Sequence, residues 1–177
     1  VVTWAPRRME LNTIPDWSSP DPIPWHTSLA IHEGRHAIQM KQGYTNVFRP
    51  LYYVLGEMIP GAYVAYPGRM LLEGDAVVAE TAFSRSGRGR NSDFMKTYML
   101  SWDKGDRRSY LAWRCDSYYK PTPDVYAFGY ALISGARTLY DKPLFMQDYW
   151  NTRSIRGRRP IAVCLFLMYY CRDIMPT

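Results

Sequence analysis

The sequence predicts a mainly α-helical domain, and three observations lead to that class. Apolar residues recur at helical spacing, the connecting segments are rich in Pro, Gly and Asp, and strand-like alternation is rare. The clearest helix begins at Thr27 and ends near Gly43. Further helices are expected over residues 50–58, 69–84, 92–102, 124–140 and 161–172. No internal repeat is visible, so we expect one helical domain over 27–177, which can belong to a longer protein.

The first 26 residues differ from the rest of the chain. They are rich in proline and show little periodicity. Because proline restricts the residue before it to extended conformations, segment 1–26 is expected to be an extended arm laid over the domain. Its first residues, VVTWAP, are a possible short β edge strand.

Composition and charge limit the classes of partner. The 177 residues are 47% hydrophobic and 15% aromatic, as in a folded domain, and the net charge is +6. The densest basic groups, 84–90, 106–108 and 153–159, contain no nucleic-acid-binding motif, so no nucleic-acid partner is expected and polyanion binding is an alternative. The longest apolar run, 161–171, is too short for a transmembrane helix.

The stretch SLAIHEGRHAIQM contains the pattern HExxH. On a helix His32 and His36 lie one turn apart, so their imidazoles can converge on one metal ion. Glu33 projects from the edge of the same sector, where a carboxylate can act as a general base without being a ligand. A buried pair of hydrogen-bonded histidines is the alternative. Burying three titratable groups on an apolar helix is costly without a partner such as a metal, which favours the metal site.

The stretch MLLEGDAVVAETAFS offers the third ligand that an open zinc site requires. Glu73 and Glu80 are two helical turns apart and share one face. Glu73 is the candidate ligand, whereas Glu80 is either an acceptor for the outer N–H of a ligand histidine or an exposed carboxylate. Asp75 points away from Glu73 and is expected to cap the helix or lie at the surface.

HExxH followed by EGxAxxxE resembles the gluzincin metallopeptidases, the superfamily of thermolysin and aminopeptidase N. More narrowly, APRRMEL, LAIHEGRHAIQ, EGDAVVAETAFSRSGRGR and PDVYAFGYAL are similar, in this order, to a group of predicted bacterial peptidases. Many members of that group are exported, and some are fused to β-propeller repeats. The resemblance covers residues 5–140 and implies a zincin-like catalytic domain.

The resemblance implies specific roles. His32, His36 and Glu73 would be the ligands of Zn²⁺, and Glu33 would be the general base of peptide hydrolysis. The substrate would be a peptide or protein, and the chain would be exported to the periplasm, the cell surface or the medium. The exopeptidase motif of aminopeptidase N is absent, so recognition of a substrate amino terminus is not expected.

The stretch VYAFGY matches the context in which aminopeptidase N relatives place a tyrosine that hydrogen-bonds the oxyanion. The resemblance therefore assigns Tyr126 this role, with Tyr130 as the substitute. Packing in the core is the alternative for both tyrosines, because the chain has 15 of them.

Three further expectations concern the surroundings of the site. The 36-residue spacer between His36 and Glu73 leaves room for YYVLGEMIPGAY to shape the cleft. Arg35 is expected to pair with Glu10 or Asp75. The stretch SRSGRGR contains three arginines, Arg85, Arg88 and Arg90. They either bind a substrate carboxylate or form structural salt bridges, and structural salt bridges are favoured.

Two functions follow from these patterns. The first is a zinc-dependent peptidase. The alternative is a non-catalytic, zinc-stabilised binding or structural subunit of a cell-surface protein complex. The presence of Glu33 favours the peptidase, because a purely structural metal site has no need of a general base.

Overall fold

The computed structural model describes residues 2–4, 8–11, 14, 23–41, 44, 48–65, 68–115, 117–122 and 124–140. This part of the chain is mainly helical, as predicted, with one two-stranded sheet. The α-helices are α1 (Trp25–Lys41), α2 (Phe48–Leu55), α3 (Met58–Ala65), α4 (Arg69–Phe83), α5 (Ser92–Asp103), α6 (Tyr110–Arg114) and α7 (Val125–Tyr140), and η2 (Arg88–Arg90) is a 3-10 turn. The helix predicted at 161–172 and the basic group 153–159 lie outside the described residues.

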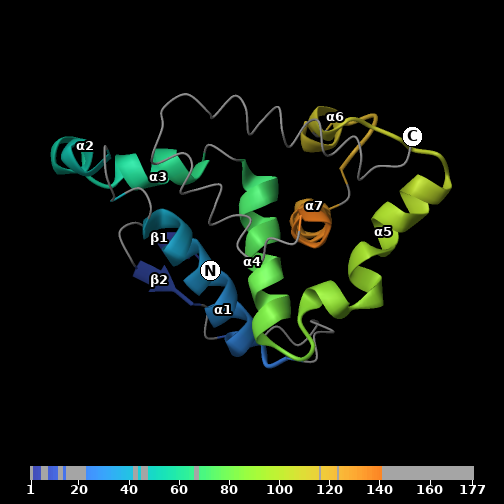
Figure 1. Ribbon diagram of the computed structural model, residues 1–177, viewed down its shortest axis with the longest axis horizontal. Coiled ribbons are helices and arrows are strands. Elements are labelled where there is room, and N and C mark those ends of the chain that lie inside the picture. Colours follow the sequence, from blue (N-terminus) through green and yellow to red (C-terminus); the bar gives the residue numbers. More distant parts are fainter. Residues whose placement is uncertain are drawn as a thin grey trace.

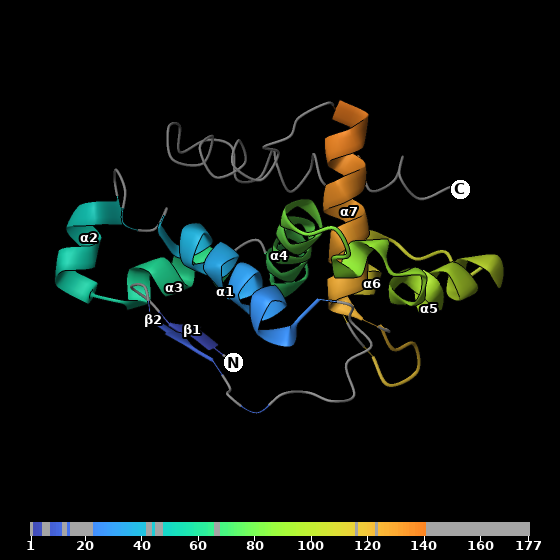
Figure 2. The same cartoon turned by 90° about the horizontal axis from the view of Figure 1, so that it is seen from below.

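Helix α4 is central to the arrangement. It lies between α1 and α7, with α5 beyond α7 (Figures 1 and 2). Its most extensive contacts are with α7, followed by those with α1. As a result α4 is covered on two sides, and every residue from 74 to 81 is buried.

The hydrophobic core lies on the α7 side of α4. The rings of Tyr98, Trp113 and Phe128 bring α5, α6 and α7 together, with centroids 5.2–5.6 Å apart. The Tyr98 hydroxyl also donates to the Asp124 carbonyl oxygen at 2.8 Å, next to the start of α7. The other core residues are Met70, Leu71, Val78, Tyr110, Ala127, Leu132, Ile133 and Ala136.

Two glycines allow α4 and α7 to approach closely. A Cβ atom at Gly74 would lie 2.1 Å from the carbonyl carbon of Gly129, and one at Gly129 would lie 1.9 Å from the Met70 carbonyl oxygen. These contacts are with backbone atoms, so a small side chain can be accommodated only if the helices move apart.

Gly74→Ala is therefore expected to lower the free energy of unfolding by about 1–3 kcal/mol, the usual cost of overpacking. Urea titration followed by circular dichroism measures the change. Gly34→Ala in α1 is the matched control, because a Cβ there meets no atom within 4 Å and alanine favours the helix. Equal unfolding midpoints for the two variants would contradict the close packing.

The face of α1 that is buried is polar. Its buried residues are His32, Glu33 and Gln39. The helix begins at Trp25, two residues before the predicted start, because the Pro24 carbonyl oxygen accepts from the amides of Thr27 and Ser28. The core is thus apolar toward α7, whereas the α1–α4 interface holds the titratable groups.

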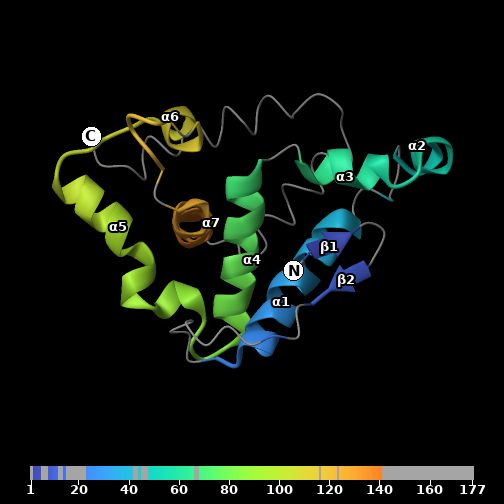
Figure 3. The ribbon, with the colours of Figure 1, turned by 180° about the vertical axis from the view of Figure 1, so that it is seen from behind.

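The predicted N-terminal strand is present, and it has a partner that the sequence did not indicate. Strand β1 (Val2–Trp4) pairs in antiparallel fashion with β2 (Arg8–Glu10), with Thr3 opposite Met9. The side chains of β2 are all exposed, so the strand lacks the alternation that marks a half-buried strand. The sheet lies beside α1 (Figure 3) and contacts it.

The segment 50–58 is not one continuous helix as predicted. Helix α2 ends at Leu55, and Gly56 has φ 61°, which ends the helix and lets α3 begin at Met58. The short α3 and α6 were not predicted.

Candidate metal centre

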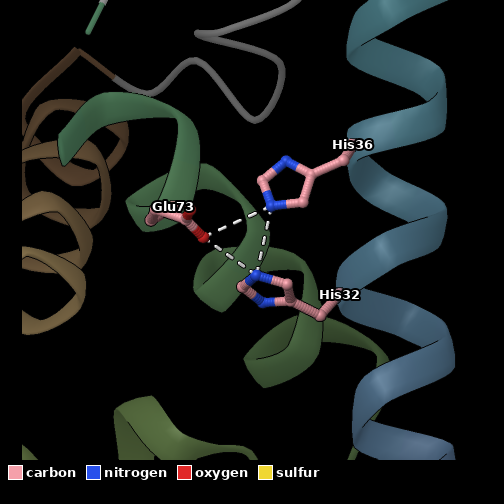
Figure 4. A group of neighbouring side chains, drawn as sticks. All are labelled: His32, His36 and Glu73. Atoms are coloured by element: carbon pink, nitrogen blue, oxygen red, sulfur yellow. Dashed lines mark hydrogen bonds and ion pairs between the residues drawn. The ribbon is translucent and has the colours of Figure 1, made fainter. Parts of the chain in front are cut away.

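Three side chains from two helices meet at one point (Figure 4). The Nε2 atoms of His32 and His36, one turn apart on α1, are 3.1 Å from each other. The Glu73 Oε2 atom on α4 lies 3.0 Å from His32 Nε2 and 3.3 Å from His36 Nε2. These residues form a group that could hold a metal ion.

The distances between the donor atoms suit a tetrahedral metal. Bonds of about 2.0–2.1 Å place neighbouring ligand atoms about 3.3 Å apart in a tetrahedron, close to the three distances of this triangle. Among the described residues, no fourth His, Cys, Asp or Glu side chain joins this group of candidate ligands. A tetrahedral ion held there would therefore keep one position for a water or substrate.

The outer nitrogens of both histidines face acceptors. His32 Nδ1 lies 2.5 Å from Glu80 Oε1, and His36 Nδ1 lies 2.8 Å from Gln39 Oε1. Arg88 Nη2 is also 3.1 Å from His32 Nδ1, but it already donates to Glu80 Oε1 at 2.5 Å, so the closer carboxylate determines the role of this nitrogen. A neutral imidazole has a single proton, so in each ring the acceptor places it on Nδ1 and leaves the Nε2 lone pair toward Glu73. Three electron-pair donors this close repel one another unless a cation or a proton lies between them.

Of the two alternatives for Glu80, the structure agrees with an acceptor for the outer nitrogen of a candidate ligand histidine, and not with an exposed carboxylate. It is fully buried, and besides His32 it accepts two hydrogen bonds from the Arg88 guanidinium, at 2.5 and 2.8 Å. The negative charge of Glu80 is thus balanced on one side by Arg88 and directed on the other to the ring of His32.

Two of the three arginines in the basic loop after α4 make structural contacts, as favoured from the sequence, whereas Arg85 is exposed. Arg88 is paired with Glu80, and Arg90 donates to the carbonyl oxygens of Thr81 and Ser84. The second basic group is also engaged internally: Arg108 pairs with Asp106 and stacks 3.9 Å over the ring of Trp113.

The surroundings shift two pKa values in opposite directions. Burial disfavours the charged form of His32, but hydrogen bonds to Glu73 and Glu80 and the charge of Glu80 outweigh it and raise the pKa of His32 to about 9. For Glu73, burial opposes ionisation, yet the hydrogen bonds from His32 and His36 lower its pKa to about 2. Without a metal, a proton on His32 is the positive charge that holds the group together.

This shift predicts how the stability of the metal-free protein depends on pH. Because the folded-state pKa of His32 is above its unfolded value of 6.5, its contribution is complete below pH 6.5 and lost as the pH rises to about 9. The free energy of unfolding in the presence of a chelator should therefore fall over this range, as urea titrations would measure. His32→Gln should flatten the curve, and the same fall in that variant would contradict the assignment.

Glu33 lies beside the group without belonging to it. Its side chain lines, with the three donors, an open cavity of about 360 Å³. Thr3 of β1 donates its hydroxyl to Glu33 Oε2 at 2.5 Å and lies 3.3 Å from the Glu33 carbonyl oxygen. The N-terminal strand thus holds the candidate base, a contact that no sequence pattern indicated.

Tyr126 and Tyr130 have different surroundings. Tyr126 lines the cavity, and its ring centroid is 5.9 Å from that of His32. Burial and the charge of Glu73 raise the pKa of its phenol, which therefore stays protonated and able to donate. Tyr130 packs against the core and the ring of Phe94, so it is not a substitute at this cavity.

One expectation about the surroundings of the site is wrong, and another has no support in the described residues. Asp75 is buried rather than at the surface, because α4 is covered on both sides there; Arg35 pairs with it at 2.7 Å and not with Glu10. Within YYVLGEMIPGAY, none of residues 52–62, whose side chains are described, lines the cavity. Besides the three donors and Glu33, the described lining residues are Thr3, Met40, Arg69, Leu72 and Tyr126.

Comparisons with known proteins do not assign the chain to a family. No protein-family model matches it, and no curated protein or solved structure is significantly similar to it. The functional argument therefore depends on the donor group, Glu33 and the cavity they share.

Proposed function

We propose that the chain is a zinc-dependent peptidase of the gluzincin type. The observation that carries this proposal is the placement of Glu33 in the same cavity as three converging metal donors of which it is not one. A stabilising metal site needs only the donors. A carboxylate beside them, directed into an open cavity, is what hydrolysis of a peptide bond requires in addition.

Each residue has one task in this proposal. Zinc, when bound, supplies positive charge that activates a water and polarises the substrate carbonyl. His32, His36 and Glu73 hold it. Glu33 takes a proton from the attacking water on a carboxylate oxygen and passes it to the nitrogen of the leaving amine. The phenol of Tyr126 donates a hydrogen bond to the carbonyl oxygen as negative charge develops on it.

Localisation and partners belong to the same proposal. The motif resemblance supports an exported protein that acts on peptides or proteins. None of the helices in the described residues has both the length and the apolar character needed to cross a membrane.

A specific observation also supports the alternative of a non-catalytic, zinc-stabilised subunit of a cell-surface protein complex. Helix α1 buries only polar residues, so a metal shared by α1 and α4 would join α1 to the remainder of the domain. Metal-dependent stability would suit both functions, whereas hydrolysis that depends on Glu33 would suit only the peptidase.

The test combines elemental analysis with a mixed peptide library. The purified protein is expected to contain one zinc per chain and to cleave peptides, and cleavage should stop when a chelator is added and resume with zinc. Absence of stoichiometric zinc, or activity that persists in the chelator, would overturn the proposal. Stoichiometric zinc with no cleavage of any peptide would favour the structural alternative.

The contact between Thr3 and Glu33 predicts a further effect. The Thr3 hydroxyl fixes the position of the Glu33 carboxylate, and misplacing a catalytic group by about 1 Å can cost about 100-fold in rate, so Thr3→Val is expected to lower kcat roughly 10- to 100-fold with little change in KM. Thr3→Ser keeps the hydroxyl and should retain most of the activity. Steady-state kinetics on one cleaved peptide measures both, and equal rates for the valine and serine variants would exclude a role for the hydroxyl.

A further inference from the structure

Gln39 is a buried amide that the proposed mechanism does not use. It lies on α1 one turn beyond His36 and is only 1% exposed. Its Oε1 atom is 2.8 Å from His36 Nδ1, and its Nε2 atom donates to Asp75 Oδ2 at 2.9 Å and to the Leu72 carbonyl oxygen at 3.2 Å. All three contacts are at hydrogen-bonding distance, so both N–H donors and the carbonyl oxygen of this buried amide have partners.

The partners of this amide determine its orientation. A carboxylate and a backbone carbonyl only accept, so the side that faces Asp75 and Leu72 must be the NH₂ group. The carbonyl oxygen of Gln39 must then face His36. Since that oxygen only accepts, the proton of His36 is on Nδ1, and its Nε2 lone pair is directed toward Glu73.

Asp75 is in turn held by Arg35. Arg35 Nε and Nη2 donate to the two carboxylate oxygens of Asp75, at 2.7 and 3.2 Å. The Asp75 side chain is 4% exposed, so its charge would be costly to bury without this partner. A chain of contacts therefore leads from Arg35 through Asp75 and Gln39 to the ring of His36.

The two histidines differ in what supports them. His32 meets the carboxylate of Glu80, whereas His36 meets a neutral amide. Each of the supporting carboxylates, Glu80 and Asp75, is paired with its own arginine. The carboxylates outside the donor group are thus each balanced by an arginine, whereas the carboxylate of Glu73 faces the two histidine rings, with Arg69 3.9 Å away.

We propose that Gln39 is the positioning residue of His36, and that Asp75 and Arg35 act through it as a relay that fixes the tautomer and orientation of this ligand. The inference depends on the metal binding of the proposed function but not on peptide hydrolysis. Supports of this kind typically change metal affinity about 10- to 100-fold. The relay explains why α1 and α4 place a buried amide and a partly buried ion pair between them.

The test measures zinc affinity by competition with a chromogenic chelator, together with the visible spectrum of the Co²⁺-substituted protein. Gln39→Met keeps the length of the side chain and removes the amide, so zinc should bind about 10- to 100-fold more weakly. Asp75→Asn should weaken binding less, by about threefold to tenfold, because the amide of Gln39 loses its anchor but remains. The Co²⁺ spectrum should change in both variants.

A double-mutant cycle tests whether Asp75 acts through Gln39. If it does, the variant with both substitutions binds zinc no more weakly than Gln39→Met alone. Tyr98→Phe is the matched control for lost stability, because it removes a buried hydrogen bond of the core far from the site and should leave zinc affinity unchanged. Unfolding of the metal-free variants is measured in parallel.

The outcomes separate the relay from the proposed function. The relay alone is overturned if the wild-type protein binds zinc and Gln39→Met matches it, if the two substitutions weaken binding multiplicatively, or if Tyr98→Phe weakens binding as much. Failure of the wild type to bind zinc overturns both proposals. Weaker zinc binding in the variants, with hydrolysis that does not depend on Glu33, supports the relay and overturns the peptidase.

Discussion

Glu33→Gln is expected to abolish most hydrolysis while the protein still binds one zinc per chain. Glutamine has nearly the same shape as glutamate but cannot accept the proton of the attacking water, and general-base catalysis typically contributes about 10²- to 10⁴-fold. We therefore expect kcat/KM to fall by at least about 100-fold, measured with a peptide cleaved by the wild-type protein. Zinc content by elemental analysis should not change, because Glu33 is outside the donor group.

The matched control is Glu10→Gln, which makes the same chemical change at an exposed residue of β2. It should have wild-type activity and zinc content. If Glu33→Gln kept full activity while Thr3→Val lost it, the carboxylate would have no role as a base. If Glu33→Gln lost its zinc, Glu33 would be needed for metal binding and would not be a separate base.

His36→Ala is expected to remove both zinc and activity. Two donors remain, His32 and Glu73, and the loss of a direct ligand should weaken binding by more than the approximately 100-fold seen when an outer partner is lost. At micromolar protein and without added metal the variant should be isolated free of zinc. Elemental analysis and peptide cleavage measure the two losses together.

His26→Ala is the control for this experiment, because His26 is exposed and lies on the same helix. It should keep zinc and activity, which would show that the effect belongs to the position and not to the number of histidines. Stoichiometric zinc in His36→Ala would contradict the three-residue site. Recovery of activity when excess zinc is added to His36→Ala would agree with it, since mass action can compensate for a weakened site.

Helical periodicity predicted the long helices well and the short ones poorly. Helices α1, α4, α5 and α7 have enough turns for an apolar pattern to repeat, and each lies within two residues of its predicted bounds. Helices α3 and α6 span 8 and 5 residues, too few for the pattern to be distinguished from a loop. Strand β2 was missed because all its side chains are exposed.

The candidate metal donors could be predicted because they depend on local spacing. His32 and His36 share a face since they are four residues apart on a helix, and Glu73 and Glu80 share one since they are two turns apart. Spacing also suggested that Glu80 could support a histidine. It could not indicate which of the two, because that depends on how α4 lies against α1.

The supports of the site depend on contacts between residues that are distant in the chain. The apolar face of α4 packs on α7 and leaves its carboxylates toward α1, which brings Asp75 to Gln39 and Glu80 to His32. Thr3 reaches Glu33 only because the N-terminal strand pair lies against α1. Periodicity is a local property of each helix, so it could be recognised from the sequence alone. The partners of Glu33 and His36 depend on how the helices and the sheet pack, so only the tertiary structure determined them.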